Sequence, residues 1–370
     1  MNNFLQIKIR MHKSKITLLI ISLIVVAEVI WILHNPLDSK ERIPAEELTV
    51  KSDHLQSASA LYVKGNQIFQ SDTNVSIILK GAVSDYFRYT LNHFSDEQDI
   101  QSELNNVIKL RSYGANIIGL YLADLNKIKK HINDLDEYIN VAKENNMYIY
   151  LIPVARDFSE SYSPVWFWKN PNNNNDLLVL IELLAQRYKS SPNVIYGFGA
   201  EPDIPSEDFD RWFNKQVELA HIVRKYNLKA PLMITGTGQY DLSGFIDKPF
   251  PLDNIIYQTG GYISANDEDF RQKLQHPELL EQTYKSFVSK GQADKYPILL
   301  SEFGGNVSED FSSDIDLQSI KKILRVIQPI GISYTGYRLS AYIDGDPLSL
   351  FDIHGNLTPR GKVFAEYLSK

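Results

Sequence analysis

The sequence predicts an α/β protein: a (β/α)8 TIM barrel with a short N-terminal β-hairpin, preceded by one N-terminal transmembrane helix. Eight short β-rich runs alternate with amphipathic segments beyond residue 60, and one long apolar run stands near the amino terminus. Continuously apolar strands that alternate with helices indicate a parallel sheet covered by helices. Eight such units match a closed barrel better than a doubly wound sheet, which usually has fewer strands.

The composition is that of a folded chain with two unlike parts. The 370 residues are 44% hydrophobic and 22% charged, and the absence of cysteine excludes disulfide scaffolds, thiol nucleophiles and cysteine-ligated metals. Residues 1–15 carry Lys8, Arg10, Lys13 and Lys15 and no acid, so the formal net charge of −7 becomes −11 for the remainder. An acidic body argues against nucleic acid as a partner, because phosphate binding needs a basic face.

The apolar run ITLLIISLIVVAEVIWIL occupies residues 16–33 and contains a single charged residue, Glu28. A spanning helix needs roughly 17–25 mostly apolar residues, so this run is long enough to cross a bilayer. The basic segment at 1–15 predicts that the amino terminus lies in the cytoplasm and the body outside. We therefore expect 16–33 to be a transmembrane signal anchor, which makes the membrane a partner of this chain.

A cleaved signal peptide is the alternative to the anchor. Met11 would then be the true start, and cleavage would follow the small residues Val25-Val26-Ala27. The apolar run continues through Leu33 without a helix breaker, which favours the anchor. A buried helix of the globular body is less favoured than either, and both preferred interpretations place the body outside the cytoplasm.

A polar segment with two prolines, residues 34–60, is predicted to be a linker, and residues 61–370 are predicted to form the barrel. At the start of the barrel, LYVKGNQIF (61–69) has a Lys-Gly-Asn turn between two β-rich halves. This pattern is typical of a hairpin.

Eight runs are predicted to be the barrel strands, at 75–79, 117–122, 147–154, 193–198, 231–235, 254–259, 297–303 and 332–337. Amphipathic helices are predicted between and after them, at 126–146, at 176–189 and at 359–368, where Pro359 suits a helix start. Active sites of such barrels lie at the carboxyl ends of the strands, so we expect the functional residues of this chain there.

Carboxylates stand at the ends of two predicted strands. Glu201 and Asp203 follow the strand at 193–198, and Glu302 ends the strand at 297–303. An unpaired charge is costly to bury, so a carboxylate directly after an apolar run favours a role at the barrel mouth. Two carboxylates about 5–5.5 Å apart form the geometry of a retaining glycosidase, in which one is the acid and the other the nucleophile.

At these residues the chain resembles glycoside hydrolase family 5, the cellulase-like family in a large clan of (β/α)8 barrels. The resemblance extends over about residues 62–370 and is carried by five stretches in order. The first, LKG (79–81), is similar to the family's first strand, and the last, HGNLTPRGKVFAEYL (354–368), to its last helix. The other three lie between them. LRSYGANIIGLYL (110–122) is similar to the passage into strand two, LLAQRYKSSPNVIYGFGAEPD (183–203) to the approach to the acid/base, and PILLSEFGG (297–305) to the nucleophile strand.

The resemblance implies that Glu201 is the general acid/base and Glu302 the nucleophile. It also implies that Tyr262, after the sixth strand, contacts the nucleophile. No cofactor is implied. Asp203 either holds Glu201 or caps the helix that starts near Ser206, and the cap is favoured.

Several positions depart from the family pattern. Ala200 replaces the asparagine expected directly before the acid/base, and Gly119 replaces an arginine expected near the end of strand two. Arg156 and Asp157 stand where a histidine usually ends strand three, and Tyr337 replaces the tryptophan of strand eight. Hydrogen bonds to the sugar 2-hydroxyl contribute several kcal/mol to such reactions. Loss of the asparagine therefore predicts slow hydrolysis of ordinary glucans, or a substrate with another group there.

Arginine and aromatic residues near the predicted mouth are the candidate substrate contacts. Arg156 and Arg338 suit an anionic or heavily substituted sugar, although surface or helix-capping roles are equally open. Trp166 and Trp168, in the loop after strand three, would stack on sugar faces or pack the loop core. Asp85, after the first strand, has the same two possible roles, contact with a sugar or packing within its loop.

Other chemistries are poorly supported. The eight histidines form no HxH or HExxH pattern, no GxSxG elbow is present, and the glycines of GNLTPRGK (355–362) are wrongly spaced for a phosphate loop. The first hypothesis is thus a membrane-anchored, extracytoplasmic retaining glycosidase acting on a β-linked polysaccharide or oligosaccharide, with a transglycosylase as its close relative. The second is a catalytically impaired glycan-binding barrel that takes part in exopolysaccharide assembly or export.

Overall fold

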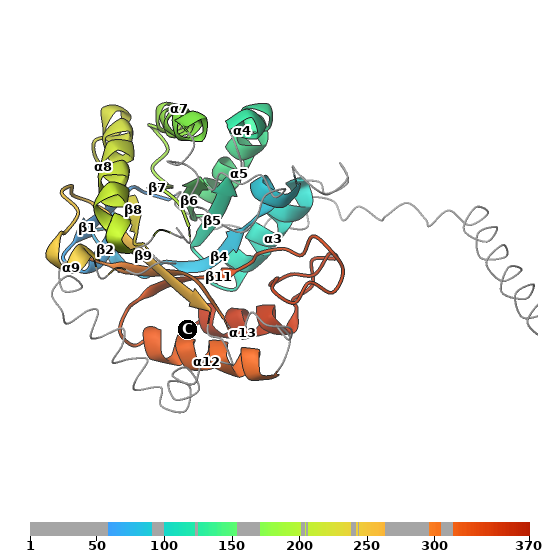
Figure 1. The fold of residues 1–370 in the computed structure, drawn as a ribbon. Coiled ribbons are helices and arrows are strands. Elements are labelled where there is room, and N and C mark those ends of the chain that lie inside the picture. Colours follow the sequence, from blue (N-terminus) through green and yellow to red (C-terminus); the bar gives the residue numbers. More distant parts are fainter. Residues whose placement is uncertain are drawn as a thin grey trace, which may run out of the picture. The chain divides into compact units, whose positions relative to one another are not determined.

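Eight parallel strands close into a barrel in the order β10-β11-β4-β5-β6-β7-β8-β9 (Figure 1). The predicted (β/α)8 architecture is therefore confirmed. The computed structural model describes residues 58–90, 100–122, 125–153, 171–200, 204, 206–237, 242, 244–262, 296–304 and 314–370.

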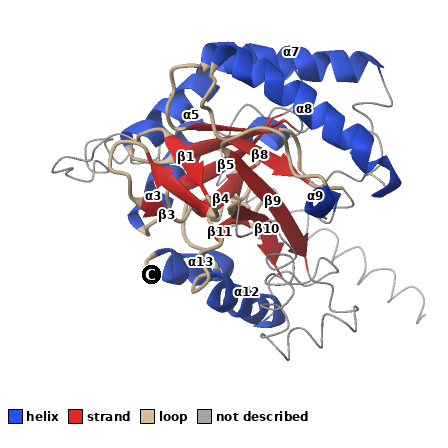
Figure 2. Cartoon of the chain, turned by 90° about the vertical axis from the view of Figure 1, so that its left-hand side faces the viewer, coloured by secondary structure: helices blue, strands red, loops and turns tan. Residues whose placement is uncertain are grey.

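The barrel strands are short and lie between layers of helices (Figure 2). Their bounds are β4 Lys80–Ser84, β5 Ile117–Leu122, β6 Tyr148–Pro153, β7 Val194–Gly197, β8 Leu232–Thr235, β9 Ile255–Tyr262, β10 Ile298–Gly304 and β11 Ser333–Tyr337. The helices are α3 Ile100–Ser112, α4 Leu125–Lys130, α5 Ile132–Glu144, α7 Pro171–Arg187, α8 Phe209–Tyr226, α9 Gly244–Asp247, α12 Asp314–Ile327 and α13 Pro359–Leu368. A π-helical turn (Tyr86–Thr90) follows β4, and a 3-10 turn (Ser206–Asp208) precedes α8.

The first barrel strand lies at 80–84, so its prediction at 75–79 was wrong. The predicted segment instead contains β3 (Ser76–Ile77), which pairs with the hairpin. Gly81 explains the error, because a Cβ there would lie 1.8 Å from the carbonyl oxygen of Ile117. The two strands can approach only at a residue without a side chain, and such a residue adds nothing to an apolar pattern.

Two of the predicted helices differ in extent. The helix predicted at 126–146 is divided into α4 and α5 at His131. Helix α7 begins at Pro171, five residues before its predicted start at 176. Proline suits the first helical turn, whereas the asparagines that follow it have poor helix propensity and concealed this turn in the sequence.

Apolar side chains fill two layers, one inside the barrel and one between the strands and the helices. On β5, Ile117 belongs to the interior cluster and Ile118 to the outer one. The same alternation continues at Leu120, which is outside, and Tyr121, which is inside. Side chains of successive strand residues point to opposite faces, so each strand contributes to both layers.

The predicted hairpin is confirmed and closes the amino-terminal end of the barrel. Strands β1 (Leu61–Lys64) and β2 (Gln67–Gln70) pair antiparallel, and β3 extends them to a three-stranded sheet. Leu61 and Ile68 join the interior apolar cluster. Just before β9, Asn254 accepts a hydrogen bond from the Val63 amide (2.8 Å). The carboxyl ends of the barrel strands lie at the opposite end from this sheet.

The predicted membrane segment at 16–33 lies outside the described residues. Among the ranges that are described, no helix combines the length and hydropathy needed to cross a membrane. The anchor, the cleaved signal peptide and the linker at 34–60 all stay predictions.

Helix α13 is tied to the barrel by a buried arginine. Pro359 is its first residue, as predicted, and the Thr358 side chain caps it by accepting from the Gly361 amide (3.0 Å). Arg360 is 1% exposed and pairs with Asp316 of α12 at 3.0 Å. Its Nη2 also donates to the carbonyl oxygen of Phe303 (3.1 Å), so two helices meet at the end of β10.

Replacing this arginine should destabilise the fold. We expect Arg360→Met to lower the free energy of unfolding by about 3–5 kcal/mol, because the buried carboxylate of Asp316 loses its arginine partner. Urea denaturation measures the loss. The double variant Asp316→Leu/Arg360→Met should recover most of it, and Lys370→Met, which breaks an exposed ion pair, should change stability by less than about 1 kcal/mol. Equal losses in the single and double variants would contradict the assignment.

Candidate active site

Glu302 stands near the carboxyl end of β10, at an irregularity in the strand. The pairing of β10 with β9 shifts register between Leu300 and Glu302. Such a bulge adds a residue to one strand and re-aims the side chains that follow. Phe303, the next residue, packs outward against Phe364 of α13 (ring centroids 5.4 Å apart), while Glu302 is only 5% exposed. The bulge therefore places a buried carboxyl group at the mouth end of the barrel.

Buried hydrogen bonds hold the backbone that carries Glu302. Gln258 of β9 donates to the Ser301 hydroxyl (2.9 Å), and Thr335 of β11 donates to the Ser301 carbonyl oxygen (2.5 Å). Gln258 in turn accepts a hydrogen bond from Tyr150 of β6. Four strands of the barrel are thus joined through polar side chains directly beneath the carboxyl group.

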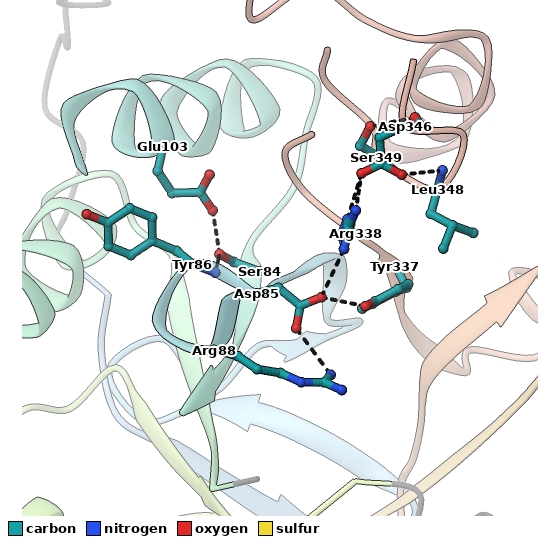
Figure 3. A network of polar contacts seen from close by, with 10 residues as sticks. All are labelled: Ser84, Asp85, Tyr86, Arg88, Glu103, Tyr337, Arg338, Asp346, Leu348 and Ser349. Carbon is teal, nitrogen blue, oxygen red and sulfur yellow. Dashed lines mark hydrogen bonds and ion pairs between the residues drawn. The ribbon is translucent and has the colours of Figure 1, made fainter. Parts of the chain in front are cut away.

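Asp85 directly follows β4 and is completely buried. One of its oxygens pairs with Arg88 Nη1 at 3.3 Å. The other accepts a hydrogen bond from the Tyr337 hydroxyl (2.5 Å) and lies 3.7 Å from Arg338 Nη1 (Figure 3). The first and eighth barrel strands are thereby joined at their carboxyl ends by one carboxylate.

Arg338 is held between two carboxylates and is not a surface or helix-capping residue. Its Nε donates to Asp346 Oδ2 at 2.8 Å, its Nη2 donates to the same oxygen, and its Nη1 faces Asp85 (Figure 3). Burial opposes its charge, but Tyr337, Asp346 and Asp85 outweigh burial and raise the pKa of Arg338. Its charge is neutralised within the protein, which removes the sequence-based reason to expect an anionic sugar there.

A second buried carboxyl group supports the turn that carries Asp85. Ser84 donates to Glu103 of α3, and the Tyr86 amide donates to the Ser84 hydroxyl at 3.2 Å (Figure 3). Tyr138 of α5 donates to the same Glu103 oxygen at 3.5 Å. Burial is the largest cause that raises the pKa of Glu103. The turn after β4 is therefore fixed from behind by a buried carboxyl group.

The electrostatics of Glu302 oppose its ionisation. Burial and the negative charge of Asp85 raise its pKa to about 8, against the smaller opposing effects of Arg88 and Arg360. A carboxyl group must be ionised to act as a nucleophile. The two arginines are therefore part of what determines whether Glu302 can react.

The structure brings together Glu302, Asp85, Tyr337 and Arg338 from the predicted set, all at the carboxyl ends of barrel strands. The backbone of Tyr262 ends β9 and pairs with Gly304. The other predicted site residues lie outside the described part of the chain: Glu201, Arg156, Asp157, Trp166 and Trp168.

Two arginines at the site were missed by sequence reasoning. Arg88 lies three residues after Asp85, within the turn that follows β4, and this spacing was the available indication. The sequence offers no such indication for Arg360, because its position at the start of the last helix is typical of an exposed residue.

Gly119 lies inside the barrel, below the mouth. A Cβ there would meet the side chains of Ile152, Val83 and Tyr150 at 3.2–3.4 Å. The interior position nearer the end of the strand is Tyr121, and the Arg88 guanidinium lies 5.3 Å from the centre of its ring. A cation therefore stands over the end of the second barrel strand, although it comes from the turn after the first.

Comparison with known proteins identifies the family. The model of the cellulase family, glycosyl hydrolase family 5, matches residues 74–342. The chain belongs to glycosyl hydrolase family 5. The resemblance found in its motifs is thereby confirmed, and the matched region contains all eight barrel strands, from β4 to β11.

Individual relatives are distant in sequence. Endoglucanase A of Butyrivibrio fibrisolvens is 24% identical over 284 residues, which are 74% of this chain and 59% of that protein. A β-glucanase of Saccharophagus degradans, solved in complex with cellotetraose, superposes with a TM-score of 0.65 at 16% identity and covers 85% of this chain and 94% of that one. A hyperthermophilic endocellulase of Pyrococcus horikoshii superposes with a TM-score of 0.65 at 15% identity, and the superposition covers 85% of this chain and 100% of that one. These structural likenesses show the shared fold.

Glu302 should make stability depend on pH. The unfolded chain ionises this group above its ordinary pKa of 4.5, but the folded protein does so only above about 8, so the folded state binds more protons in between. The free energy of unfolding therefore falls as pH rises through this window. We expect Glu302→Gln to stabilise the protein by on the order of 3 kcal/mol at pH 8.5 and by little at pH 4.5.

Chemical denaturation at a series of pH values measures this effect. Glu366→Gln, at an exposed ion pair on α13, is the control and should change stability by about 0.5 kcal/mol or less at every pH. A gain for Glu302→Gln that is the same at pH 4.5 and pH 8.5 would contradict the burial argument.

Proposed function

We propose that this protein is a retaining glycoside hydrolase of a β-linked glucan, with Glu302 as nucleophile and Glu201 as general acid/base. The observation that carries the proposal is the buried, bulge-directed carboxyl group of Glu302 at the mouth of a family 5 barrel. The strand-end position of Glu201 in the motif GFGAEPD supports the second role.

The chemistry follows from two carboxyl groups in different protonation states. Glu201, protonated, donates to the leaving glycosidic oxygen while the Glu302 carboxylate attacks the anomeric carbon. A covalent glycosyl-enzyme forms, and Glu201, now ionised, takes a proton from the water that hydrolyses it. A sugar acceptor in place of water would give transglycosylation with the same residues.

A neutral sugar suits the charges at the mouth. Arg338 is engaged by Asp85 and Asp346, and Arg88 also pairs with Asp85. With Glu302 included, this group contains three carboxyl groups, Asp85, Asp346 and Glu302, and two arginines, Arg88 and Arg338. An anionic sugar would therefore meet net repulsion when Glu302 is ionised. The names of the relatives, an endoglucanase and a β-glucanase solved with cellotetraose, favour a β-glucan.

We also propose that residues 16–33 anchor the protein in a membrane with the barrel outside the cytoplasm, where it would act on polysaccharide at the cell surface. The apolar run and its basic flank support this placement. The full-length chain should sediment with membranes and be released by detergent but not by high salt. A mature chain that begins after Ala27 and remains soluble would favour the cleaved signal peptide instead.

A glycan-binding barrel without catalysis is the second candidate. It is favoured by Ala200, which stands where the family resemblance implies an asparagine beside the acid/base, and by the raised pKa of Glu302. Such a protein would bind polysaccharide in exopolysaccharide assembly or export and release no product.

A glycan panel separates these candidates. Purified wild-type protein should release reducing sugar from at least one neutral β-glucan or from cellotetraose, and proton NMR should show that the first-formed product keeps the β-configuration. We expect Glu302→Gln and Glu201→Gln to lower kcat by at least about 10³-fold each, as removal of a catalytic group does. Glu366→Gln should leave the rate unchanged. Full activity of either active-site variant would refute its assignment, and binding without turnover on every glycan would favour the second candidate.

A further inference from the structure

We propose that Tyr150, Gln258 and Thr335 are positioning residues for the reaction: acting through Ser301, they hold the bulge of β10 that turns Glu302 toward the barrel interior. All three act on the backbone that carries the carboxyl group and not on the sugar. This inference rests on the proposed function, in which Glu302 is the nucleophile.

The bulge determines which face of β10 carries Glu302. Leu300 and Phe303 both belong to the outer apolar layer, although they are three residues apart. Residues two apart share a face in a regular strand, so without the bulge Glu302 would lie on the outer face with Leu300. The pairing with β9 passes over Ser301, which is therefore the extra residue. One residue thus turns the carboxyl group away from the helices.

Side-chain hydroxyl groups satisfy the backbone at this bulge. An extra residue disturbs the hydrogen bonds of the ladder, and buried backbone groups need partners. Ser301 is completely buried. Its carbonyl oxygen accepts from the Thr335 hydroxyl of β11 (2.5 Å), and its own hydroxyl donates to the carbonyl oxygen of Thr259 (3.2 Å). The bulge therefore depends on hydrogen bonds that side chains supply.

The amide of Gln258 determines where the Ser301 hydroxyl donates. The amide nitrogen donates to the Ser301 oxygen at 2.9 Å, so the hydroxyl hydrogen is left for Thr259. The amide oxygen accepts a hydrogen bond from Tyr150. If that donor were lost, the amide could turn over and accept the hydrogen of Ser301 instead, which would leave the Thr259 carbonyl group without it.

Tyr150 reaches Gln258 across the barrel interior, because two glycines leave room for its ring. Strand β6, which carries Tyr150, is separated from β9 by β7 and β8. A Cβ on Gly197 of β7 would overlap the tyrosine ring, and a Cβ on Gly119 of β5 would lie 3.4 Å from it. Tyr150, Gln258 and Ser301 are completely buried, so water does not compete for these hydrogen bonds.

Loss of a hydrogen bond in this chain should misplace Glu302 without removing it. A displacement of about 1 Å caused by a residue far from the reacting atoms can cost about 10²-fold in rate. With full-length protein and cellotetraose, we expect Tyr150→Phe and Gln258→Met each to lower kcat by between about tenfold and 100-fold and to leave KM within about twofold. Because both residues act through one chain of hydrogen bonds, the double variant should lose little more than the weaker single variant.

Two matched comparisons separate this role from the loss of any buried hydroxyl. Tyr196 of β7 lies in the outer layer, and its buried hydroxyl has no hydrogen-bond partner among the residues that the structure describes. Tyr196→Phe should therefore keep the wild-type kcat. Thr335→Val removes a donor with little change of shape and should lower kcat as Tyr150→Phe does, whereas Thr335→Ser keeps the hydroxyl and should restore most of the activity.

The rate at which Glu302 is labelled by 2-deoxy-2-fluoro-β-cellobiosyl fluoride tests the position of the nucleophile directly. The Glu302 carboxylate attacks the anomeric carbon, a carbon–oxygen bond forms, and the carbon–fluorine bond breaks as fluoride leaves with the bonding electrons. Fluoride leaves without an acid catalyst, so the rate reports on Glu302 and not on Glu201. Mass spectrometry of the labelled peptide measures this rate at a temperature at which circular dichroism shows every variant to be folded.

We expect Tyr150→Phe to be labelled on Glu302 at least about tenfold more slowly than the wild type. A merely structural role would leave the labelling rate of the folded protein unchanged. Equal rates in Tyr150→Phe and the wild type, or an equal loss in Tyr196→Phe, would overturn the inference.

Failure of the inference is distinguishable from failure of the proposed function. If Glu302→Gln keeps wild-type turnover, or if the wild type is labelled on another residue, the nucleophile assignment itself is wrong and the proposed function fails. If the wild type is labelled on Glu302 and Tyr150→Phe reacts at the same rate, only the positioning role is rejected.

Discussion

A carboxylate with no access to water must have its charge balanced within the protein, and at the mouth of this barrel that carboxylate is Asp85. Its partners are Arg88, Tyr337 and Arg338, and the last of these requires a carboxylate of its own, Asp346. Satisfying one buried group therefore orders the turn after β4, the end of β11 and the loop beyond it. The shape of the mouth around Glu302 follows from this requirement.

The network explains why the Glu302 carboxylate lowers the stability of the folded protein. A barrel interior closed by apolar layers raises the pKa of any carboxyl group at its edge, and Asp85 adds to the effect. The bulge and the hydrogen bonds of Ser301 hold Glu302 in place in spite of this cost. The stability that is lost by burying Glu302 is offset by the buried contacts around it, a pattern that is common at functional sites.

Much of the fold could be predicted because it depends on local patterns. The strand at 117–122 is an unbroken apolar run, and its bounds were predicted without error. Strand β4 was misplaced because its tight packing depends on Gly81, whose role is visible only against Ile117. Within the site, Asp85 and Tyr337 were named separately, but they are 252 residues apart in sequence and their hydrogen bond could not be foreseen. Arg360 escaped notice because burial of a helix-start arginine is a tertiary property.

The small sheet of β1 to β3 has a consequence for how the barrel is presented. Ala58, the first described residue, is buried at the end of the barrel that this sheet closes, opposite the mouth. The two ends of the barrel therefore differ in character: apolar packing of the small sheet stabilises one end, and the buried polar groups Asp85, Tyr337 and Glu302 lie at the other.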